Sequence, residues 1–175
     1  HLGLEGSAVI TDLGKDVDGF NLGDRVAYVG LPIGAYSEQR NYPANGLVKI
    51  PESISNELAA ASMLKGLTAW YLANKSYPIK IGDDVLIYAA AGGVGLFLSQ
   101  WVHHLGARVI GIVSTSEKAE LAHLNGCMEI IYADDKQLVK KTRELTNGKG
   151  VAAVYDSVGK DPFYQSLDCL QPHGV

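Results

Sequence analysis

The first fifty residues contain three short β-rich hydrophobic runs, separated by polar turns that contain glycine. The runs cover residues 4–10, 25–29 and 47–50, and their composition predicts strands. Short strands at this spacing are typical of a small antiparallel barrel, although three are too few to close one. Pro51 ends this pattern, so we interpret residues 1–50 as part of a barrel domain.

From residue 51 the hydrophobic pattern becomes one in which helix and strand alternate. A helical pattern covers residues 54–73, and we expect Gly66 to interrupt it. Strand patterns then begin near Val85, Arg108, Glu129 and Val151, about 22 residues apart. Helical patterns follow these strands, over residues 94–105, 115–125, 136–146 and 162–170.

Repeated β-α units of this length require a parallel sheet with right-handed crossovers. We therefore predict an α/β fold, a Rossmann-type doubly wound parallel sheet over residues 51–175. The sheet is expected to be incomplete, because Gly174 and Val175 resemble the beginning of a further strand. The chain also begins at His1 without a methionine. We interpret it as an internal piece of a longer protein.

Composition and charge exclude several classes of protein. With 47% hydrophobic and 19% charged residues, the chain is typical of a globular domain. A net charge of −4 without a basic block gives no indication of nucleic-acid binding. The apolar region at residues 85–98 is shorter than the ~20 residues of a membrane helix, and no export signal is visible. Cys127 and Cys169 form no Cys-x-x-Cys motif, which favours unpaired thiols and a cytoplasmic location.

A glycine-rich turn follows the first strand of the β-α repeat. Against the dinucleotide-binding template G-x-G-x-x-G, the chain has Ala90, Gly92 and Gly95. Backbone N–H groups at the start of the next helix would face a pyrophosphate, and the helix dipole favours its charge. The alternative is a glycine-rich turn without a ligand, which the surrounding β-α repeat makes less favourable.

The residues after the second strand indicate which dinucleotide binds. The position about 20 residues beyond the glycines contacts the adenosine ribose, and an acid there favours NAD. Here the strand ends at Ser114, followed by Thr115, Ser116 and Lys118, so hydroxyls and an ammonium predict NADP(H). Glu117 fits a capping box with Ser114, its side chain turned back to the Ser114 N–H. In the alternative interpretation, Ser114 only caps the helix and Lys118 is an exposed surface lysine.

Six stretches in this order together resemble one family, the zinc-free quinone oxidoreductases of the medium-chain dehydrogenase/reductase superfamily. The stretches are Leu-Gly-Leu-Glu-Gly at 2–6, Gly-Asp-Arg-Val at 23–26, Gly-Ala-Tyr-Ser-Glu at 34–38, Lys-Gly-Leu-Thr-Ala at 65–69, Ala-Ala-Ala-Gly-Gly-Val-Gly at 89–95 and Val-Tyr-Asp-Ser-Val-Gly at 154–159. The resemblance implies that residues 1–50 are part of a GroES-like catalytic domain. It also implies that residues 51–175 are an NADP(H)-binding Rossmann domain that lacks its C-terminal part.

Two positions of this resemblance bear on zinc. Leu4 stands where zinc-dependent members of the superfamily have a histidine ligand, and Lys65 matches their cysteine ligand. Leucine cannot bind zinc, and lysine stays protonated at neutral pH. His103 and His104 are adjacent on a predicted helix and face different ways, so we do not expect them to bind a metal together. The sequence therefore predicts no metal site.

The resemblance implies zinc-independent hydride transfer from NADPH to a quinone, by a full-length homodimer. The alternatives are a reductase of α,β-unsaturated carbonyls and a non-catalytic, crystallin-like NADPH-binding protein. No residue is identified as a catalytic acid. Tyr36 and Tyr42 either line the substrate side or pack within the β-rich part of the chain.

The resemblance also implies a set of cofactor contacts. They are Gly92, Gly93 and Val94 at the pyrophosphate, Ser114 and Lys118 at the 2′-phosphate, and Tyr71, Ser157 and Val158 along the phosphates and ribose. Relatives often have a tyrosine after the third strand that stacks near the 2′-phosphate. Here Tyr132 stands one position earlier, so it either replaces that contact or the contact is lost. Asp156, after the fourth strand, is either a ligand-side residue or a turn aspartate.

Overall fold

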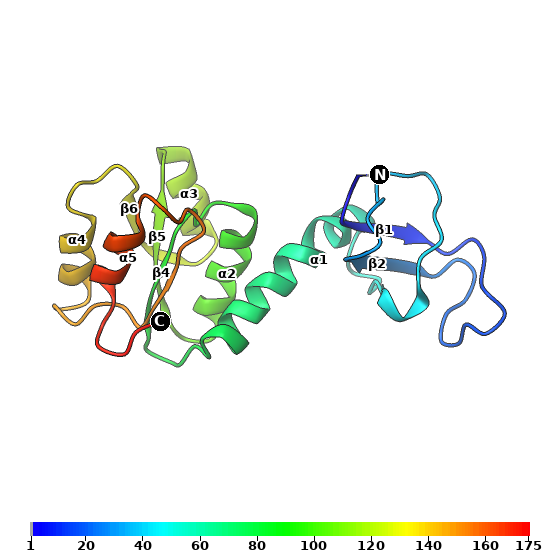
Figure 1. Ribbon diagram of the computed structural model, residues 1–175, viewed down its shortest axis with the longest axis horizontal. Coiled ribbons are helices and arrows are strands. Elements are labelled where there is room, and N and C mark those ends of the chain that lie inside the picture. The colour runs from blue at the N-terminus through cyan, green and yellow to red at the C-terminus, as the bar shows by residue number, and fades with distance from the viewer. Residues whose placement is uncertain (1) are drawn as a thin grey trace. The chain divides into compact units, whose positions relative to one another are not determined.

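The computed structural model describes residues 2–175, which divide into two compact units. The first unit extends to Leu67 and the second begins at Thr68, so the division falls within helix α1 (Asn56–Tyr71). The sequence pattern places the domain boundary earlier, at Pro51, where the type of pattern changes. Figure 1 labels the helices and strands of both units.

The first unit contains a three-stranded antiparallel sheet in the order β1-β2-β3. Its strands are β1 (Glu5–Val9), β2 (Arg25–Val29) and β3 (Leu47–Lys49), and a short 3-10 turn, η1 (Ala44–Gly46), precedes β3. The central strand β2 is the most buried because it has a neighbour on both edges, and Val26 and Tyr28 are almost fully enclosed. The three predicted strands are confirmed to within a residue at each end.

Helix α1 continues through Gly66, so the expected interruption at this glycine is wrong. A glycine inside a helix costs about 1 kcal/mol relative to alanine, which a long helix tolerates when its other residues pack well. Ala69, one turn later, is fully buried. The helix then widens into a π-helical turn, η2 (Leu72–Ser76), and ends at Tyr77, which is extended.

The second unit is built on a four-stranded parallel sheet in the order β6-β5-β4-β7. The strands are β4 (Asp84–Ile87), β5 (Arg108–Val113), β6 (Cys127–Tyr132) and β7 (Ala153–Tyr155). This order confirms the Rossmann-type prediction, with the strand order reversing beside β4. The last strand begins two residues later than predicted, because Val151 forms an isolated bridge to Leu170 instead.

Helices cover both faces of this sheet, as Figure 1 shows. They are α2 (Gly93–His104), α3 (Ser116–Leu124), α4 (Leu138–Leu145) and α5 (Phe163–Cys169). One apolar core lies between the sheet and the face covered by α2 and α3, with Leu98 and Val102 at its centre. The second core lies under α4 and α5 and includes Leu138 and Cys169. Burial on both faces explains why β4 and β5 are continuous apolar runs in the sequence.

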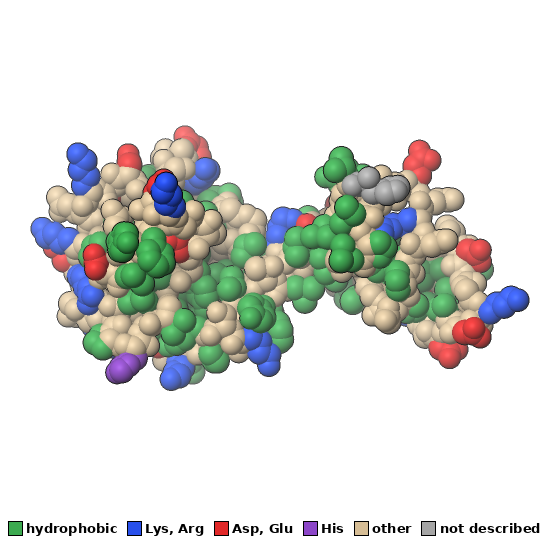
Figure 2. Space-filling view, in the orientation of Figure 1, with side chains coloured by type: hydrophobic (Ala, Val, Ile, Leu, Met, Phe, Trp, Pro, Cys, Tyr) green, Lys and Arg blue, Asp and Glu red, His purple; other side chains and the backbone are tan. Residues whose placement is uncertain are grey.

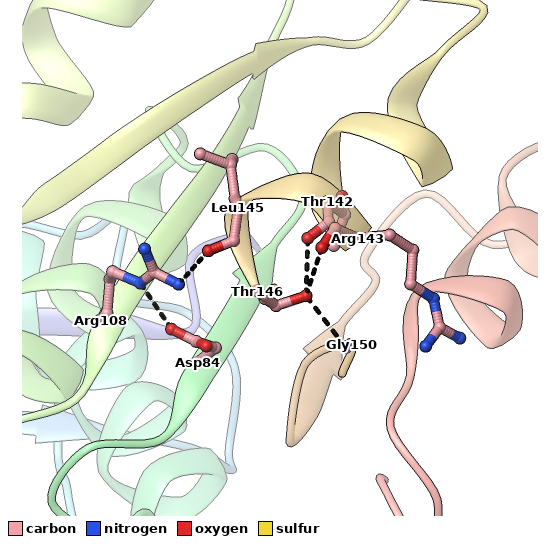
Figure 3. A network of polar contacts seen from close by, with 7 residues as sticks. All are labelled: Asp84, Arg108, Thr142, Arg143, Leu145, Thr146 and Gly150. Atoms are coloured by element: carbon pink, nitrogen blue, oxygen red, sulfur yellow. Dashed lines mark hydrogen bonds and ion pairs between the residues drawn. The ribbon is translucent and has the colours of Figure 1, made fainter. Parts of the chain in front are cut away.

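A polar network joins the end of α4 to the amino end of the sheet (Figure 3). The Arg108 guanidinium pairs with Asp84 at 2.5 Å and donates to the Leu145 carbonyl at 2.6 Å. Thr146 donates to the Thr142 carbonyl and accepts from the Gly150 N–H, so its hydroxyl closes the turn after α4. These bonds lie at the amino edge of the sheet.

Val175 extends the sheet at the outer side of β7. Its N–H donates to the Ala152 carbonyl at 3.0 Å, and its carbonyl accepts from the Val154 N–H at 2.8 Å. Among the described residues, 174 and 175 are not assigned to a strand, so the expectation that they begin one stays a prediction.

Charged side chains of both signs are mixed over the surface in view in Figure 2, where Lys and Arg alternate with Asp and Glu. Among residues 2–175, every helix falls short of the length and apolar character that crossing a bilayer requires.

Candidate functional site

The glycine-rich turn lies at the carboxyl end of β4, between that strand and α2. Its backbone is fixed on both sides, because the Tyr88 N–H donates to the Tyr155 carbonyl and the Ala90 N–H donates to the Ile112 carbonyl. Ala89 adopts a left-handed conformation at φ 48°, which makes the turn sharp. The turn is therefore held by both neighbouring strands, β7 and β5.

Two glycines allow the close approach of helix α2 to this turn. A Cβ atom on Gly95 would lie 2.3 Å from the Ala89 carbonyl oxygen, and one on Gly92 would lie 3.0 Å from the same atom. Ala90 replaces the first glycine of the template, and its side chain is fully buried. Gly92 is the N-cap of α2 and provides no side-chain cap, so the first N–H groups of the helix lack a side-chain partner there. Such a helix start binds anions, including the pyrophosphate of a dinucleotide.

The second part of the site lies after β5, at the same edge of the parallel sheet. Thr115 is the N-cap of α3, and its side chain accepts from the Lys118 N–H at 3.3 Å. The predicted capping box of Ser114 with Glu117 is therefore wrong, because the N-cap lies one residue later. The hydrogen bond from the Thr115 hydroxyl is the main cause that lowers the pKa of Glu117. Thr115 is thus the N-cap of α3, and Ser114 is not.

Ser114 and Lys118 contact each other directly. The Lys118 ammonium donates to the Ser114 hydroxyl at 3.0 Å, and both residues are exposed. An ammonium beside a hydroxyl presents hydrogen-bonding groups of the kind that bind a phosphate.

Tyr132 ends β6 beside this pair. It is opposite Val113, the residue before Ser114, and the Ala133 N–H donates to the Val113 carbonyl at 2.8 Å. The Tyr132 side chain is 42% exposed. The sheet register thus brings Tyr132 to the carboxyl edge that carries Ser114, as expected for parallel neighbours.

The turn after β7 is organised by Asp156. Its carboxylate accepts from the Val158 N–H at 2.8 Å, the Gly159 N–H at 2.9 Å and the Ser166 hydroxyl at 2.9 Å. Asp156 is therefore a turn aspartate, and its bonds present Ser157 and Val158 as exposed residues.

Tyr71 is the last residue of α1, directly before the π-helical turn, and its side chain is 56% exposed. Sequence reasoning missed the residue that fixes this junction. The Tyr155 hydroxyl donates to the Leu72 carbonyl at 2.9 Å, across 83 residues of sequence. No local pattern marks such a contact, because only the fold brings the end of β7 to the end of α1.

One hollow in the second unit lies at the amino end of β6 and is lined by residues that include His103, His123 and Met128. This is the opposite edge of the sheet from Ser114 and the glycine-rich turn. It is therefore separate from the candidate site.

Comparison with known proteins gives consistent matches over this architecture. A family described as zinc-binding dehydrogenase matches residues 93–175. A quinone oxidoreductase from Pseudomonas aeruginosa is 47% identical over 99% of this chain and 54% of its own length. The crystal structure of Escherichia coli quinone oxidoreductase complexed with NADPH is 46% identical, with a TM-score of 0.94 over 99% of this chain and 53% of that chain. Over 99% of its length the chain is therefore similar to quinone oxidoreductases of known sequence and structure.

A 2-haloacrylate reductase from Burkholderia sp. is as similar as these relatives, at 47% identity over 99% of this chain and 53% of its own length. The chain thus spans about half the length of the curated relatives that it matches.

The two positions that bear on zinc are those of Leu4 and Lys65. Lys65 forms an ion pair with Glu5 at 2.5 Å, and the other oxygen of Glu5 accepts from the Leu64 N–H at 2.8 Å. Leu4 is 38% exposed and offers no ligand atom. Over residues 2–175, no three His, Cys, Asp or Glu side chains are grouped as a metal site would need.

The two tyrosines considered for the substrate side differ in their surroundings. Tyr42 stacks against Tyr28 with ring centroids 4.4 Å apart, and the Arg40 guanidinium lies over both rings. Tyr42 therefore packs within the first unit. Tyr36 is 81% exposed and does not pack in this way.

Proposed function

We propose that this chain is the NADPH-binding and partial catalytic region of a quinone oxidoreductase that works without zinc. The observation that carries the proposal is the contact between Lys118 and Ser114, 3.0 Å apart at the carboxyl edge of β5. A carboxylate at the end of this strand would favour NAD, because it accepts from the 2′-hydroxyl and repels a 2′-phosphate. The relatives solved with NADPH, from Escherichia coli and from a mycobacterium, support the same cofactor.

The residues of the glycine-rich turn fit the rest of the dinucleotide. Gly92, Gly93 and Val94 are proposed to hold the pyrophosphate with the start of α2, where the absence of a side-chain cap leaves N–H groups for the anion. The tight packing of Gly95 against the Ala89 carbonyl supports this role, because the helix start must lie close to the turn.

The remaining proposed contacts are at the ends of β6 and β7 and at the end of α1. Tyr132 is assigned to the 2′-phosphate end, and Tyr71, Ser157 and Val158 are assigned to the phosphates and ribose. The exposure of each of these side chains supports the assignment.

NADPH supplies a hydride, which a quinone takes up together with a proton to give the hydroquinone. A quinone is already electrophilic, so the reaction needs no metal to polarise a carbonyl. The protein is proposed to bind and orient the two reactants and to exclude water from the reacting atoms. The Lys65–Glu5 ion pair and Leu4 support a reaction without zinc. Leu4 has no ligand atom, and the Lys65 ammonium is paired with Glu5.

A second candidate activity is the reduction of an activated alkene. The 2-haloacrylate reductase is as similar to this chain as the quinone oxidoreductases are, so sequence identity supports the two activities equally. Steady-state rates of the full-length protein with matched quinones and α,β-unsaturated carbonyls separate the two activities. NADPH binding without reduction of either class would support the non-catalytic alternative.

The test of the cofactor is a calorimetric titration of the full-length protein with NADPH and with NADH. We expect NADPH to bind at least about tenfold more tightly, as one charge-assisted phosphate contact provides. Lys118→Ala is expected to remove most of that difference. Lys140→Ala is the matched control, because Lys140 is an exposed lysine of α4 whose ammonium lies 3.8 Å from the Glu144 carboxylate. Equal affinities for the two cofactors would contradict the proposal.

The homodimer and the cytoplasmic location remain part of the proposal. β7 lies at one edge of the sheet, where a second subunit is proposed to add. Analytical ultracentrifugation of the full-length protein tests the dimer, and fractionation of the source cells tests the location.

A further inference from the structure

Tyr155 lies where three segments of the proposed NADPH site meet. Its carbonyl accepts from the Tyr88 N–H at 2.9 Å, at the point where β4 passes into the glycine-rich turn. The next residue, Asp156, holds the turn that presents Ser157 and Val158. The main chain of Tyr155 therefore connects two of the segments that are assigned to the cofactor.

The Tyr155 side chain reaches the third segment. Its hydroxyl donates to the Leu72 carbonyl at 2.9 Å, and Leu72 directly follows Tyr71 in the chain. Leu72 is also the first residue of the π-helical turn, and its carbonyl accepts from the Tyr77 N–H at 3.2 Å. In an α-helix that carbonyl would accept from the N–H four residues later. The widened turn and the Tyr155 hydroxyl thus share one acceptor, and π-turns of this kind are frequent at functional sites.

The surroundings of the hydroxyl keep it a donor. The ring of Tyr155 packs against the core under α2, and burial is the main cause that raises its pKa to about 12. At neutral pH the hydroxyl is therefore protonated and can make this bond.

We propose that Tyr155 is a positioning residue of the cofactor site. Its hydroxyl holds the end of α1 so that Tyr71 faces the cofactor together with the glycine-rich turn and the turn after β7. This inference rests on the proposed function, because the cofactor contact of Tyr71 belongs to that proposal. The Tyr155 hydroxyl donates its hydrogen bond to the Leu72 carbonyl and not to the cofactor, so Tyr155 acts through the position of Tyr71.

Tyr155→Phe in the full-length protein tests this role, because it removes the hydroxyl and keeps the ring in the core. We expect NADPH to bind about two- to tenfold more weakly, the range that the net contribution of one hydrogen bond gives. NADH should weaken by the same factor, because the 2′-phosphate contacts at Ser114 and Lys118 are unchanged. This equal loss differs from the effect of Lys118→Ala, which is confined to NADPH.

Tyr77→Phe is the matched control. The Tyr77 hydroxyl donates to the Asp83 carboxylate at 3.1 Å, so this variant also loses one hydroxyl bond in the same core but leaves the Leu72 carbonyl bonded to Tyr155. We expect it to lower the melting temperature as much as Tyr155→Phe does, with no change in either dissociation constant. A purely structural role for Tyr155 would give the two variants the same behaviour in both measurements, and that result would overturn the inference.

A double-mutant cycle with Tyr71→Ala tests whether the effect passes through Tyr71. We expect Tyr155→Phe to weaken NADPH no further once Tyr71 has been truncated, because residues that act as a unit are not additive. Additive effects would overturn the inference while leaving the proposed function intact. If the unmodified protein showed no preference for NADPH that depends on Lys118, the proposed function would fail and this inference with it.

Discussion

The Lys118 ammonium donates a hydrogen bond to the Ser114 hydroxyl at 3.0 Å. Helix α3 begins one residue later than its sequence suggests, with Thr115 as the N-cap. The Ser114 hydroxyl is therefore not the cap of α3, and it lies beside the only charge of this segment that suits a phosphate. A shift of one residue in the helix cap thus leaves the Ser114 hydroxyl without a capping role in α3.

Ser114→Ala and Thr115→Ala should separate these roles. Ser114→Ala is expected to weaken NADPH about threefold and to leave NADH unchanged, because a neutral hydroxyl contributes less than the ammonium. Thr115→Ala should lower the free energy of unfolding by about 1 kcal/mol, as the loss of an N-cap does, and leave the preference for NADPH intact. Calorimetric titration and urea denaturation of both variants give the two readouts. The reverse pattern would show that Ser114 is the cap.

Gly95→Ala should disrupt the start of α2. Its Cβ would lie 2.3 Å from the Ala89 carbonyl oxygen and 2.7 Å from the Ala90 carbonyl oxygen, and backbone atoms cannot move cheaply. We expect a loss of about 2 kcal/mol in the free energy of unfolding and a large loss of NADPH affinity.

Gly66→Ala is the matched control for this substitution. A Cβ at Gly66 meets no atom within 4 Å, and the residue lies inside α1. Alanine there should increase the free energy of unfolding by about 0.5–1 kcal/mol. Destabilisation by Gly66→Ala, or a neutral effect of Gly95→Ala, would contradict the packing described for these two positions.

Arg143 is expected to stabilise the second unit through its geometry as well as its charge. Its guanidinium donates to the carbonyls of Asp168, Leu170, Gly148 and Lys149, and so joins the ends of α4 and α5. Arg143→Lys should lower the free energy of unfolding by about 1–2 kcal/mol, because an ammonium cannot reach several carbonyls at once. Equal stability of the lysine variant and the unmodified protein in urea would refute this role.

Treatment with a chelator should change neither the stability nor the affinity for NADPH. Lys65 is paired with Glu5, and Leu4 stands at the other position that bears on zinc, so neither offers a histidine or cysteine ligand. Melting temperature and NADPH titration before and after dialysis against o-phenanthroline, with elemental analysis for zinc, check this expectation. Stoichiometric zinc, or a fall in melting temperature after dialysis, would count against it.

Both cysteines should react slowly in the folded protein. Burial is the main cause that raises the pKa of Cys127 and of Cys169, so little thiolate is present at pH 8. The pKa of each thiol is higher in the folded than in the unfolded protein. The two thiols therefore contribute fully to stability below the pKa of the unfolded state, and this contribution is lost as the pH rises through the pKa of the folded state. Mass spectrometry after iodoacetamide treatment should find label only when urea is added. Rapid labelling of the folded protein would contradict the burial of both thiols.

Local patterns in the sequence determined the elements of the second unit and their order. Continuous apolar runs predicted strands buried on both faces, and the glycines that follow the helical stripes predicted where the helices end, to within two residues in most cases. A parallel sheet follows from such a repeat because each strand and helix must return the chain to the same edge. The glycine-rich turn and the residues after β5 were identified for the same reason, since they are consecutive in the chain.

Tertiary structure decided what depends on atoms far apart in sequence. The uninterrupted helix through Gly66 and the cap at Thr115 reflect packing and side-chain geometry, which local preferences predict poorly. The bond from Tyr155 to the Leu72 carbonyl joins residues 83 positions apart, and the pair of Lys65 with Glu5 joins residues 60 positions apart. The sequence by itself determined the kind of fold and the chemical groups along its carboxyl edge. Only the folded chain decided which of those groups meet, because contact between distant residues is set by how the sheet and helices pack together.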